Sequence, residues 1–314
     1  MKKALLAVAV AATLPMAAFA WTPQQDVNVI IAYKAGSGTD TGARLLMTMA
    51  EKHIGKTVII NNLPGADGKI GWTRLVNSRP DGYTIGFINL PTFTTLANEK
   101  NAAFKVSQVV PIANHLNETG VVVVRADSKW QNLNDLVKDA KASGKLRAST
   151  NGVKASNHTA AQLLAKSANF EYKAIPYGGT ADQLLALRQG EVDFTCAKIA
   201  DVAKLIAGDK PELRLLGVFD TQRLADYPNV PTLGELGYYD QWYGSARAIV
   251  APAGMPADVL KYWVDTFKTV MSDPEVIEAH KKGGLTMSYM DDKQLGELIK
   301  AQDAFARDVI SKLY

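Results

Sequence analysis

The sequence predicts an α/β protein built from two α/β domains. Short apolar stretches rich in Val and Ile alternate with amphipathic stretches of helical length through most of the chain. This alternation is typical of a mostly parallel sheet with helices on both faces. The pattern begins near residue 27 and is repeated from about residue 121 onward. A chain of 314 residues is long enough for two such domains with sizeable cores.

The first twenty residues have the pattern of a secretory signal peptide. Residues 1–3 are positively charged, residues 4–14 are apolar, and residues 18–20 supply a small-x-small cleavage pattern. The apolar run is shorter than the roughly 20 residues that a membrane-spanning helix needs. We therefore expect cleavage after Ala20 and an exported, periplasmic protein whose mature chain begins at Trp21.

Charge and cysteine content narrow the classes of partner. The formal net charge of +4 includes Lys2 and Lys3 of the signal segment, and the weak positive balance that remains favours neither nucleic acid nor an anionic membrane as a partner, so we expect no nucleic-acid partner. Cys196 is the only cysteine, so no intrachain disulfide can form. We interpret Cys196 as a small buried apolar side chain.

The first strand, loop and helix form a candidate anion site. The apolar run at residues 27–33 predicts a buried strand, and Gly36 and Gly38 allow the backbone to turn closely after it. Thr39 or Asp40 is expected to cap a helix whose apolar positions are Ala43, Leu46, Met47, Ala50 and Ile54. The helix N-terminus presents free N–H groups and a positive dipole end, which favour an anion.

The rest of the first α/β unit follows in order. Gly55 is a glycine C-cap, and the segments after it predict a strand at 57–60, a turn-rich loop at 61–68, a helix at 69–76, a turn at 78–82 and a strand at 83–88. The middle of the chain repeats this plan, with expected strands at 121–124, 146–149, 192–194 and 213–218. After the junction at residues 36–40, a second loop-to-helix junction spans residues 150–158, where Ser156 or Asn157 is the expected N-cap. A third junction spans residues 175–180.

The last part of the chain reads as one strand at 246–252 followed by helices. A short helix is expected to have its N-terminal cap at residues 272–274. The last helix is expected to have Asp291 or Asp292 as its N-cap. The strands at 121–124 and 246–250 are placed where two crossover strands would form a hinge. We expect domain 1 to comprise residues 21–122 and 250–314, and domain 2 residues 123–249.

Enzymatic interpretations find little support in the sequence. The Gly36-x-Gly38-x-x-x-Gly42 pattern resembles a dinucleotide fingerprint, but the second strand ends in Asn61-Asn62 where that fingerprint needs an acidic residue. No Gly-x-Ser-x-Gly nucleophile motif is present, and the four histidines lack metal-ligand spacing. We therefore expect no catalysis, no cofactor and no metal. His158, beside a polar loop at a helix start, is expected either to contact a ligand or to serve as a cap.

Loops rich in Gly, Ser, Thr and Asn lead into helix N-termini in both predicted domains. Such loops would line an interdomain cleft with backbone and hydroxyl donors suited to a carboxylate, and a hinge would close the cleft on its ligand. Trp242 and Tyr243 either wall this pocket or pack near the hinge.

Nine short motifs occur in a recognisable order, at residues 36–40, 62–71, 80–84, 156–158, 176–179, 190–193, 229–235, 242–244 and 251–256. Through them the chain resembles the Bug-type extracytoplasmic receptors of tripartite tricarboxylate transporters. The resemblance implies a type II periplasmic-binding-protein fold, with two α/β domains joined by crossover hinge strands. It further implies a monomer that captures a small carboxylate and delivers it to membrane permease subunits. A ligand-presenting sensor component for a membrane kinase is the alternative role.

The resemblance also implies which residues bind the ligand. In domain 1 they are Tyr33, Lys34, Ala35, Gly36, Ser37, Gly38, Thr39, Asp40, Ala66, Asp67 and Gly68. In domain 2 they are Asn151, Ser156, Asn157, His158, Tyr177, Gly178, Gly179, Thr180 and Asp193.

Several of these positions depart from the family pattern. Lys34 and Ala35 stand where the family usually has Pro, Ser37 replaces Gly, and Asp67 lies in a loop that is usually Gly-Ala-Gly-Gly. Lys34 would add a charge-assisted bond to a carboxylate. Asp67 would either repel a carboxylate or select a ligand that carries an amine. The alternative for both is exposure to solvent at the loop edge.

Overall fold

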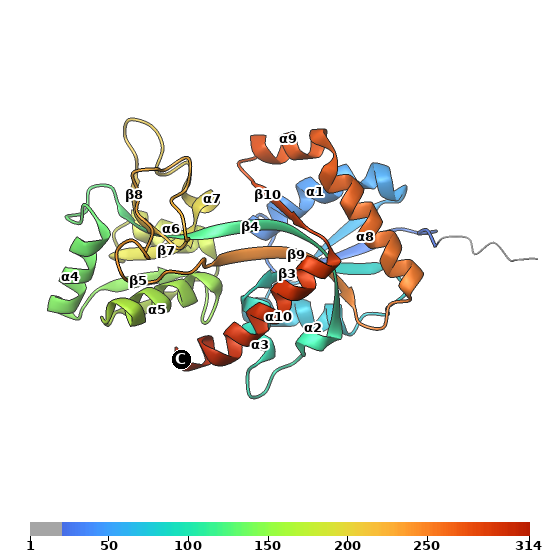
Figure 1. Cartoon of the computed structure of the whole chain (residues 1–314), viewed down its shortest axis with the longest axis horizontal. Coiled ribbons are helices and arrows are strands. Elements are labelled where there is room, and N and C mark those ends of the chain that lie inside the picture. The colour runs from blue at the N-terminus through green and yellow to red at the C-terminus, as the bar shows by residue number, and fades with distance from the viewer. Residues whose placement is uncertain (1–20) are drawn as a thin grey trace, which may run out of the picture.

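The computed structural model describes residues 21–314, so the expected signal peptide lies outside the described residues. Two halves lie side by side, and the long strands β4 (Val109–Arg125) and β9 (Gly244–Pro252) run between them (Figure 1). Within the described part of the chain, no helix has the length and apolar character needed to cross a membrane.

The first half is built from both ends of the described sequence. Its N-terminal elements are β1 (Val27–Ile31), α1 (Gly38–Ile54), β2 (Val58–Asn62), the 3₁₀ turn η1 (Ala66–Gly68), α2 (Lys69–Val76), β3 (Thr84–Leu90), α3 (Thr92–Ala97) and η2 (Val106–Gln108). Its C-terminal elements are α8 (Ala257–Ser272), α9 (Pro274–Lys282), β10 (Met287–Met290), α10 (Asp292–Asp308) and η3 (Ile310–Lys312).

The second half is built from the middle of the chain. Its elements are α4 (Leu133–Ser143), β5 (Arg147–Thr150), α5 (Ser156–Ala168), β6 (Lys173–Pro176), α6 (Thr180–Arg188), β7 (Phe194–Lys198), α7 (Ile199–Val202) and β8 (Leu213–Val218). The predicted repetition of the α/β plan is therefore present.

The sheet is mixed, which differs from the mostly parallel sheet that the sequence predicts. The strand order is β2-β1-β3-β9-β4-β7-β5-β6, with β8 and β10 also paired to β4. Pairs β1–β2, β1–β3, β5–β6 and β5–β7 are parallel, whereas β4 and β9 pair antiparallel with all their neighbours. The difference arises because the linking strands run back between the halves instead of joining βαβ units.

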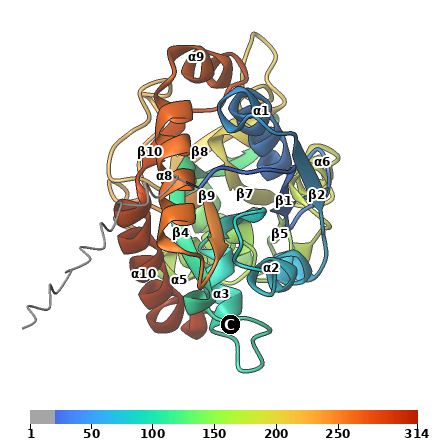
Figure 2. The same cartoon turned by 90° about the vertical axis from the view of Figure 1, so that its right-hand side faces the viewer.

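Helices cover both faces of the sheet in each half, as predicted (Figure 2). In the first half, α1, α8 and α9 pack on the face that carries Val29 and Ile31, while α2, α3 and α10 pack on the face that carries Ile30. In the second half, α4 and α5 cover one face and α6 and α7 the other. Strands buried on both faces explain the continuous apolar runs in the sequence.

The predicted strand at 121–124 is only the end of the 17-residue β4. Residues 109–119 pair with β9, and residues 120–125 pair with β7 and β8. The first part escapes sequence analysis because polar residues such as His115 and Glu118 interrupt its apolar pattern, although both are buried. The short edge strand β10 was also not predicted.

Candidate functional site

A cavity of about 520 Å³ lies between the two halves. The loop after β1, the turn η1 and the end of β3 line it from the first half. The loops before α5 and α6 and the end of β7 line it from the second half, while β9 contributes Ser245 and Arg247. Its volume suits a small molecule.

Most of the predicted site residues line this single cavity. They are Tyr33, Lys34, Ala35, Gly36, Ser37, Gly38, Thr39, Ala66, Asp67, Gly68, Asn151, Ser156, Asn157, Tyr177, Gly178, Gly179 and Thr180. The structure thus brings together loops separated by up to about half of the described sequence. Asp40, His158 and Asp193 do not line the cavity.

Asp40 shapes the first loop from behind. Its buried carboxylate accepts hydrogen bonds from the Gly36 N–H (2.8 Å) and from Asn62 Nδ2 (2.8 Å), and it pairs with Arg44 at 3.0 Å. Burial opposes ionisation, but the bonds from Arg44, Gly36 and Asn62 outweigh it and lower the pKa of Asp40. Ser37, rather than Thr39 or Asp40, is the N-cap of α1, because its Oγ accepts from the Asp40 N–H.

His158 and Asp193 also have structural partners. His158 Nδ1 accepts from the Lys154 N–H at 3.0 Å, and its ring packs edge-on against Tyr314. Burial lowers the pKa of His158 to about 4, so the ring is neutral at physiological pH. The Asp193 carboxylate accepts from the Arg147 N–H at 2.7 Å. In this structure His158 therefore contacts the loop before α5 and is not part of the cavity lining.

Lys198, which sequence analysis missed, places a buried cation at the cavity. It lies at the end of β7, and its Nζ donates to Ser156 Oγ (3.1 Å) and to Asn157 Oδ1 (2.5 Å). Burial lowers the pKa of Lys198 to about 8, although the nearby Asp201 and Glu118 favour the charged form. The ammonium is thus still mainly protonated at neutral pH.

The contacts of Lys198 also explain why the N-cap prediction for α5 is wrong. Ala155 is the N-cap and makes no side-chain capping bond. Ser156 and Asn157 are the first helical residues, and their side chains are engaged by Lys198 instead. Tyr243 Oη donates to the Ser156 carbonyl at 3.1 Å, which holds this helix start against the linking strands.

Arg247 is a second buried cation that was missed. It lies on β9, donates from Nη1 to the Gly38 carbonyl (2.9 Å) and forms an ion pair with the buried Glu118 of β4. Burial raises the pKa of Glu118, and the charge of Arg247 opposes that shift. Gly38 is needed where it stands, because a Cβ there would lie 2.7 Å from Arg247 Nη2.

The signal for both cations was present in the sequence. Lys198 and Arg247 each lie inside or at the end of an otherwise apolar strand, and a charged side chain is seldom buried without a partner or a function. The strand predicted at 192–194 ends before Lys198, and Arg247 lies inside the strand predicted at 246–252.

The Trp242–Tyr243 pair packs near the hinge and does not line the cavity. Tyr243 is buried in the core of the second half, and Trp242 Nε1 donates to Thr119 Oγ1 at 3.2 Å. Cys196 is fully buried, as predicted, and burial raises the pKa of its thiol to about 12.

Contacts beside the cavity connect the two halves. Lys154 of the second half pairs with Glu99 of the first at 3.4 Å, and Glu99 also pairs with Lys69 of its own half at 2.7 Å. Asp67 lies directly against Gly152 of the second half. The structure therefore represents an arrangement in which the loops of both halves touch.

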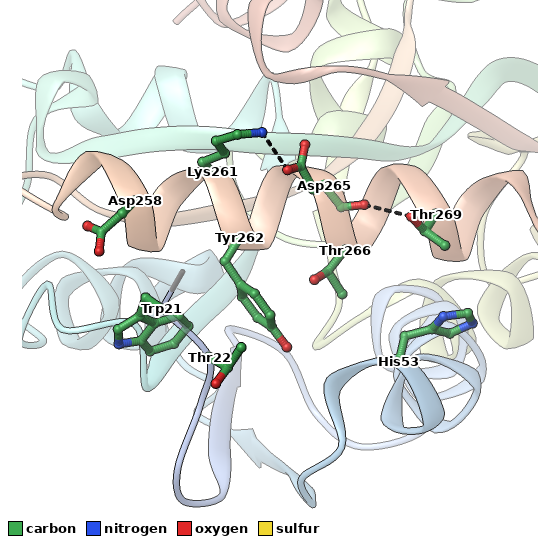
Figure 3. A pocket seen from close by; sticks show the side chains of 9 residues that line it. All are labelled: Trp21, Thr22, His53, Asp258, Lys261, Tyr262, Asp265, Thr266 and Thr269. Atoms are coloured by element: carbon green, nitrogen blue, oxygen red, sulfur yellow. Dashed lines mark hydrogen bonds and ion pairs between the residues drawn. The ribbon is translucent and has the colours of Figure 1, made fainter. Parts of the chain in front are cut away.

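A second hollow of about 360 Å³ lies beside α8 in the first half (Figure 3). Residues on α8 line most of it, together with Trp21, Thr22 and His53. Two of its charged residues, Lys261 and Asp265, pair with each other at 2.6 Å. Unlike the first cavity, it gathers no loops from the two halves, and none of the predicted site residues line it.

Comparison with known proteins agrees with this architecture. Residues 43–314 match the family described as "Tripartite tricarboxylate transporter family receptor". The "UPF0065 protein in gbd 5'region" of Cupriavidus necator is 30% identical over 292 residues, which are 93% of this chain and 88% of that protein.

Two solved structures confirm the periplasmic-binding fold. The periplasmic binding protein BugD is 25% identical with a TM-score of 0.82, over 93% of this chain and 98% of BugD. MatC from Rhodopseudomonas palustris with bound malate is 22% identical with a TM-score of 0.82, over 92% of this chain and 99% of MatC. The match to the family model covers most of the chain, and the chain therefore belongs to the family of tripartite tricarboxylate transporter receptors.

Proposed function

We propose that this protein is a periplasmic receptor that captures a small carboxylate between its two halves and delivers it, without catalysis, to a membrane permease. One observation carries the proposal. The buried cations Lys198 and Arg247 and the N-terminal residues of α1 and α5 belong to the same cavity. The N–H groups at a helix start and nearby cations both favour a carboxylate.

The fold and the family support this role. MatC, which shares the fold, is described with bound malate, a small dicarboxylate. The signal-peptide pattern of residues 1–20 supports cleavage after Ala20 and a periplasmic location. We further propose domain 1 as residues 21–122 and 250–314 and domain 2 as 123–249, with β4 and β9 as the hinge and a monomer as the working form.

A ligand screen tests the proposal directly. The mature protein is heated with a panel of mono-, di- and tricarboxylates, and each hit is measured by calorimetry. A bound acid raises the melting temperature, because it stabilises the folded state by mass action. Turnover of a substrate by a protein that binds no organic acid would refute the proposal. A deletion strain that loses uptake, rather than induction of a response, separates the receptor from the sensor role.

A further inference from the structure

The charges around the cavity balance before any ligand enters. Its lining contains three cationic side chains and three anionic ones, namely Lys34, Lys198, Arg247, Asp67, Asp182 and Asp201. Behind the lining, Glu118 already pairs with Arg247. A plain dicarboxylate would thus add two negative charges to a partly desolvated site that has no excess of positive charge.

Within residues 21–314 none of the three cavity carboxylates forms an ion pair, but Asp182 and Asp201 each have a cation of the cavity lining nearby. The cation that acts on Asp67 is Lys69, which lies outside the lining. The negative charge of Asp201 lies close enough to Lys198 to favour its protonated form, which raises the pKa of the ammonium. Asp182 and Lys34 flank the same glycine, since a Cβ on Gly178 would lie 3.5 Å from Asp182 Oδ2 and 3.8 Å from Lys34 Nζ.

Asp67 is different. Within residues 21–314 its carboxylate forms no ion pair and accepts no hydrogen bond, and the neighbouring Lys69 is held by Glu99 at 2.7 Å. Asp67 is half-buried, and burial raises its pKa; the charge of Lys69 opposes this shift, and the charge of Glu99 adds to it. A half-buried carboxylate without a partner is costly, which makes it a receptor group for a ligand cation.

The surroundings of Asp67 fit an ammonium group. Tyr33 lines the same part of the cavity, and the charge of Asp67 acts on its hydroxyl. A carboxylate next to an aromatic ring is a favourable environment for an alkylammonium. Asp67 also adopts a left-handed backbone conformation, with φ +57°, of the kind that is often found at ligand-binding positions.

We propose that the ligand is an amino-carboxylate, and that Asp67 binds its ammonium group while Lys198, Arg247 and the helix starts bind its carboxylate end. The proposal rests on the proposed receptor function and narrows its ligand class. It assigns Asp67, in a loop where the family pattern usually has no charge, as the residue that determines specificity.

Matched pairs of ligands test this assignment. Succinate is compared with aspartate, glutarate with glutamate, and adipate with 2-aminoadipate, by calorimetry at one pH and salt concentration. We expect the wild type to bind at least one amino member about tenfold or more tightly than its amine-free partner. Asp67→Asn should reduce that ratio to about threefold or less, chiefly by weakening the amino member.

The variants are chosen so that each result is decisive. Asn tolerates the left-handed backbone of Asp67 and keeps the side-chain shape, so D67N should fold, which its melting temperature checks. Asp265→Asn, on the exposed face of α8, removes the same charge away from the cavity and should leave the ratio unchanged. Tighter binding of the amine-free acids by the wild type, or an unchanged ratio in D67N, would overturn this inference alone. If none of the six acids binds, this inference fails, whereas the proposed receptor function fails only if the full panel of mono-, di- and tricarboxylates also gives no hit.

Discussion

Lys198 is a buried ammonium whose two hydrogen-bond acceptors belong to the first two residues of α5. If it contacts the ligand carboxylate, Lys198→Met should weaken binding about 10- to 100-fold, because a hydrogen bond between charged groups is worth about 1.5–3 kcal/mol. Calorimetry with the best ligand of the screen measures this. Lys261→Met, which removes an exposed lysine on α8, is the matched control and should not change the affinity.

The pKa of Lys198 predicts how binding depends on pH. Burial lowers this pKa to about 8, and only the protonated ammonium attracts a carboxylate. We therefore expect the affinity to fall by several-fold as the pH rises from about 7 to about 9.5. Lys198→Met should show a flatter profile over the same range. Equal slopes in the two proteins would show that Lys198 does not contact the ligand.

The histidine pair in the first half predicts a different pH effect. His280 Nδ1 donates to the Val276 carbonyl at 2.7 Å, so its Nε2 accepts from His115 Nε2–H at 2.9 Å. Burial lowers the pKa of both rings, and neither has a hydrogen-bonded carboxylate within the described residues. Both rings are thus neutral in the folded state.

The unfolded histidines bind protons near pH 6.5, whereas the folded ones do not. The contribution of this pair to the free energy of unfolding is therefore fully present above about pH 6.5 and is lost as the pH falls below it. We expect the free energy of unfolding to fall by up to about 1.4 kcal/mol per pH unit for each histidine. Urea denaturation between about pH 7.5 and 5 measures it. In the double variant His115→Leu/His280→Leu, the free energy of unfolding should depend less steeply on pH. The same pH dependence in the variant and the wild type would contradict the conclusion that the buried pair is neutral.

At the scale of elements, the start of α1 depends on Asp40. Replacing it by Ala leaves the Gly36 N–H, the Asn62 amide and the Arg44 guanidinium without their shared acceptor. We expect Asp40→Ala to lower the free energy of unfolding by about 2–3 kcal/mol and to weaken ligand binding, because the glycine loop lines the cavity. Chemical denaturation and calorimetry test both effects. Asp135→Ala, in the first turn of α4, removes a partly exposed carboxylate and should cost less than about 1 kcal/mol.

The elements show what the sequence could predict and where local rules failed. The apolar positions of α1 were identified correctly, because helical spacing fixes one face and that face packs on the sheet. The caps of α1 and α5 were misplaced, although suitable residues are present at both junctions. In α5 the reason is tertiary: Ser156 and Asn157 bond to Lys198, which is about forty residues away in sequence.

At the scale of the whole molecule, the sequence predicted the two halves, their order and nearly all the loops that line the cavity. It could not predict which charges meet across the fold, because pairs such as Arg247–Glu118 lie far apart in the chain. It also missed the path of the C-terminal helix. This helix packs on α3 and β4 of the first half, and beyond it Tyr314 Oη lies 3.1 Å from Thr159 Oγ1 of the second.

The ion pair between Lys154 and Glu99 connects the two halves beside the cavity and should influence ligand release. Both side chains are partly exposed, so the pair is worth less than about 1 kcal/mol. We therefore expect Lys154→Met to weaken apparent affinity by no more than about fivefold. This loss should appear mainly as faster dissociation in stopped-flow displacement, because opening is what the pair resists.

Lys69→Met is the matched control for this prediction. Lys69 pairs with the same carboxylate of Glu99 but from within the first half, so its loss removes equal charge without removing a contact between the halves. At low salt the ligand should dissociate faster from the Lys154→Met variant than from the Lys69→Met variant. The difference between the two dissociation rates should shrink as salt screens the exposed pair. Equal rates for the two variants would mean that general electrostatics, and not a bond between the halves, governs release of the ligand.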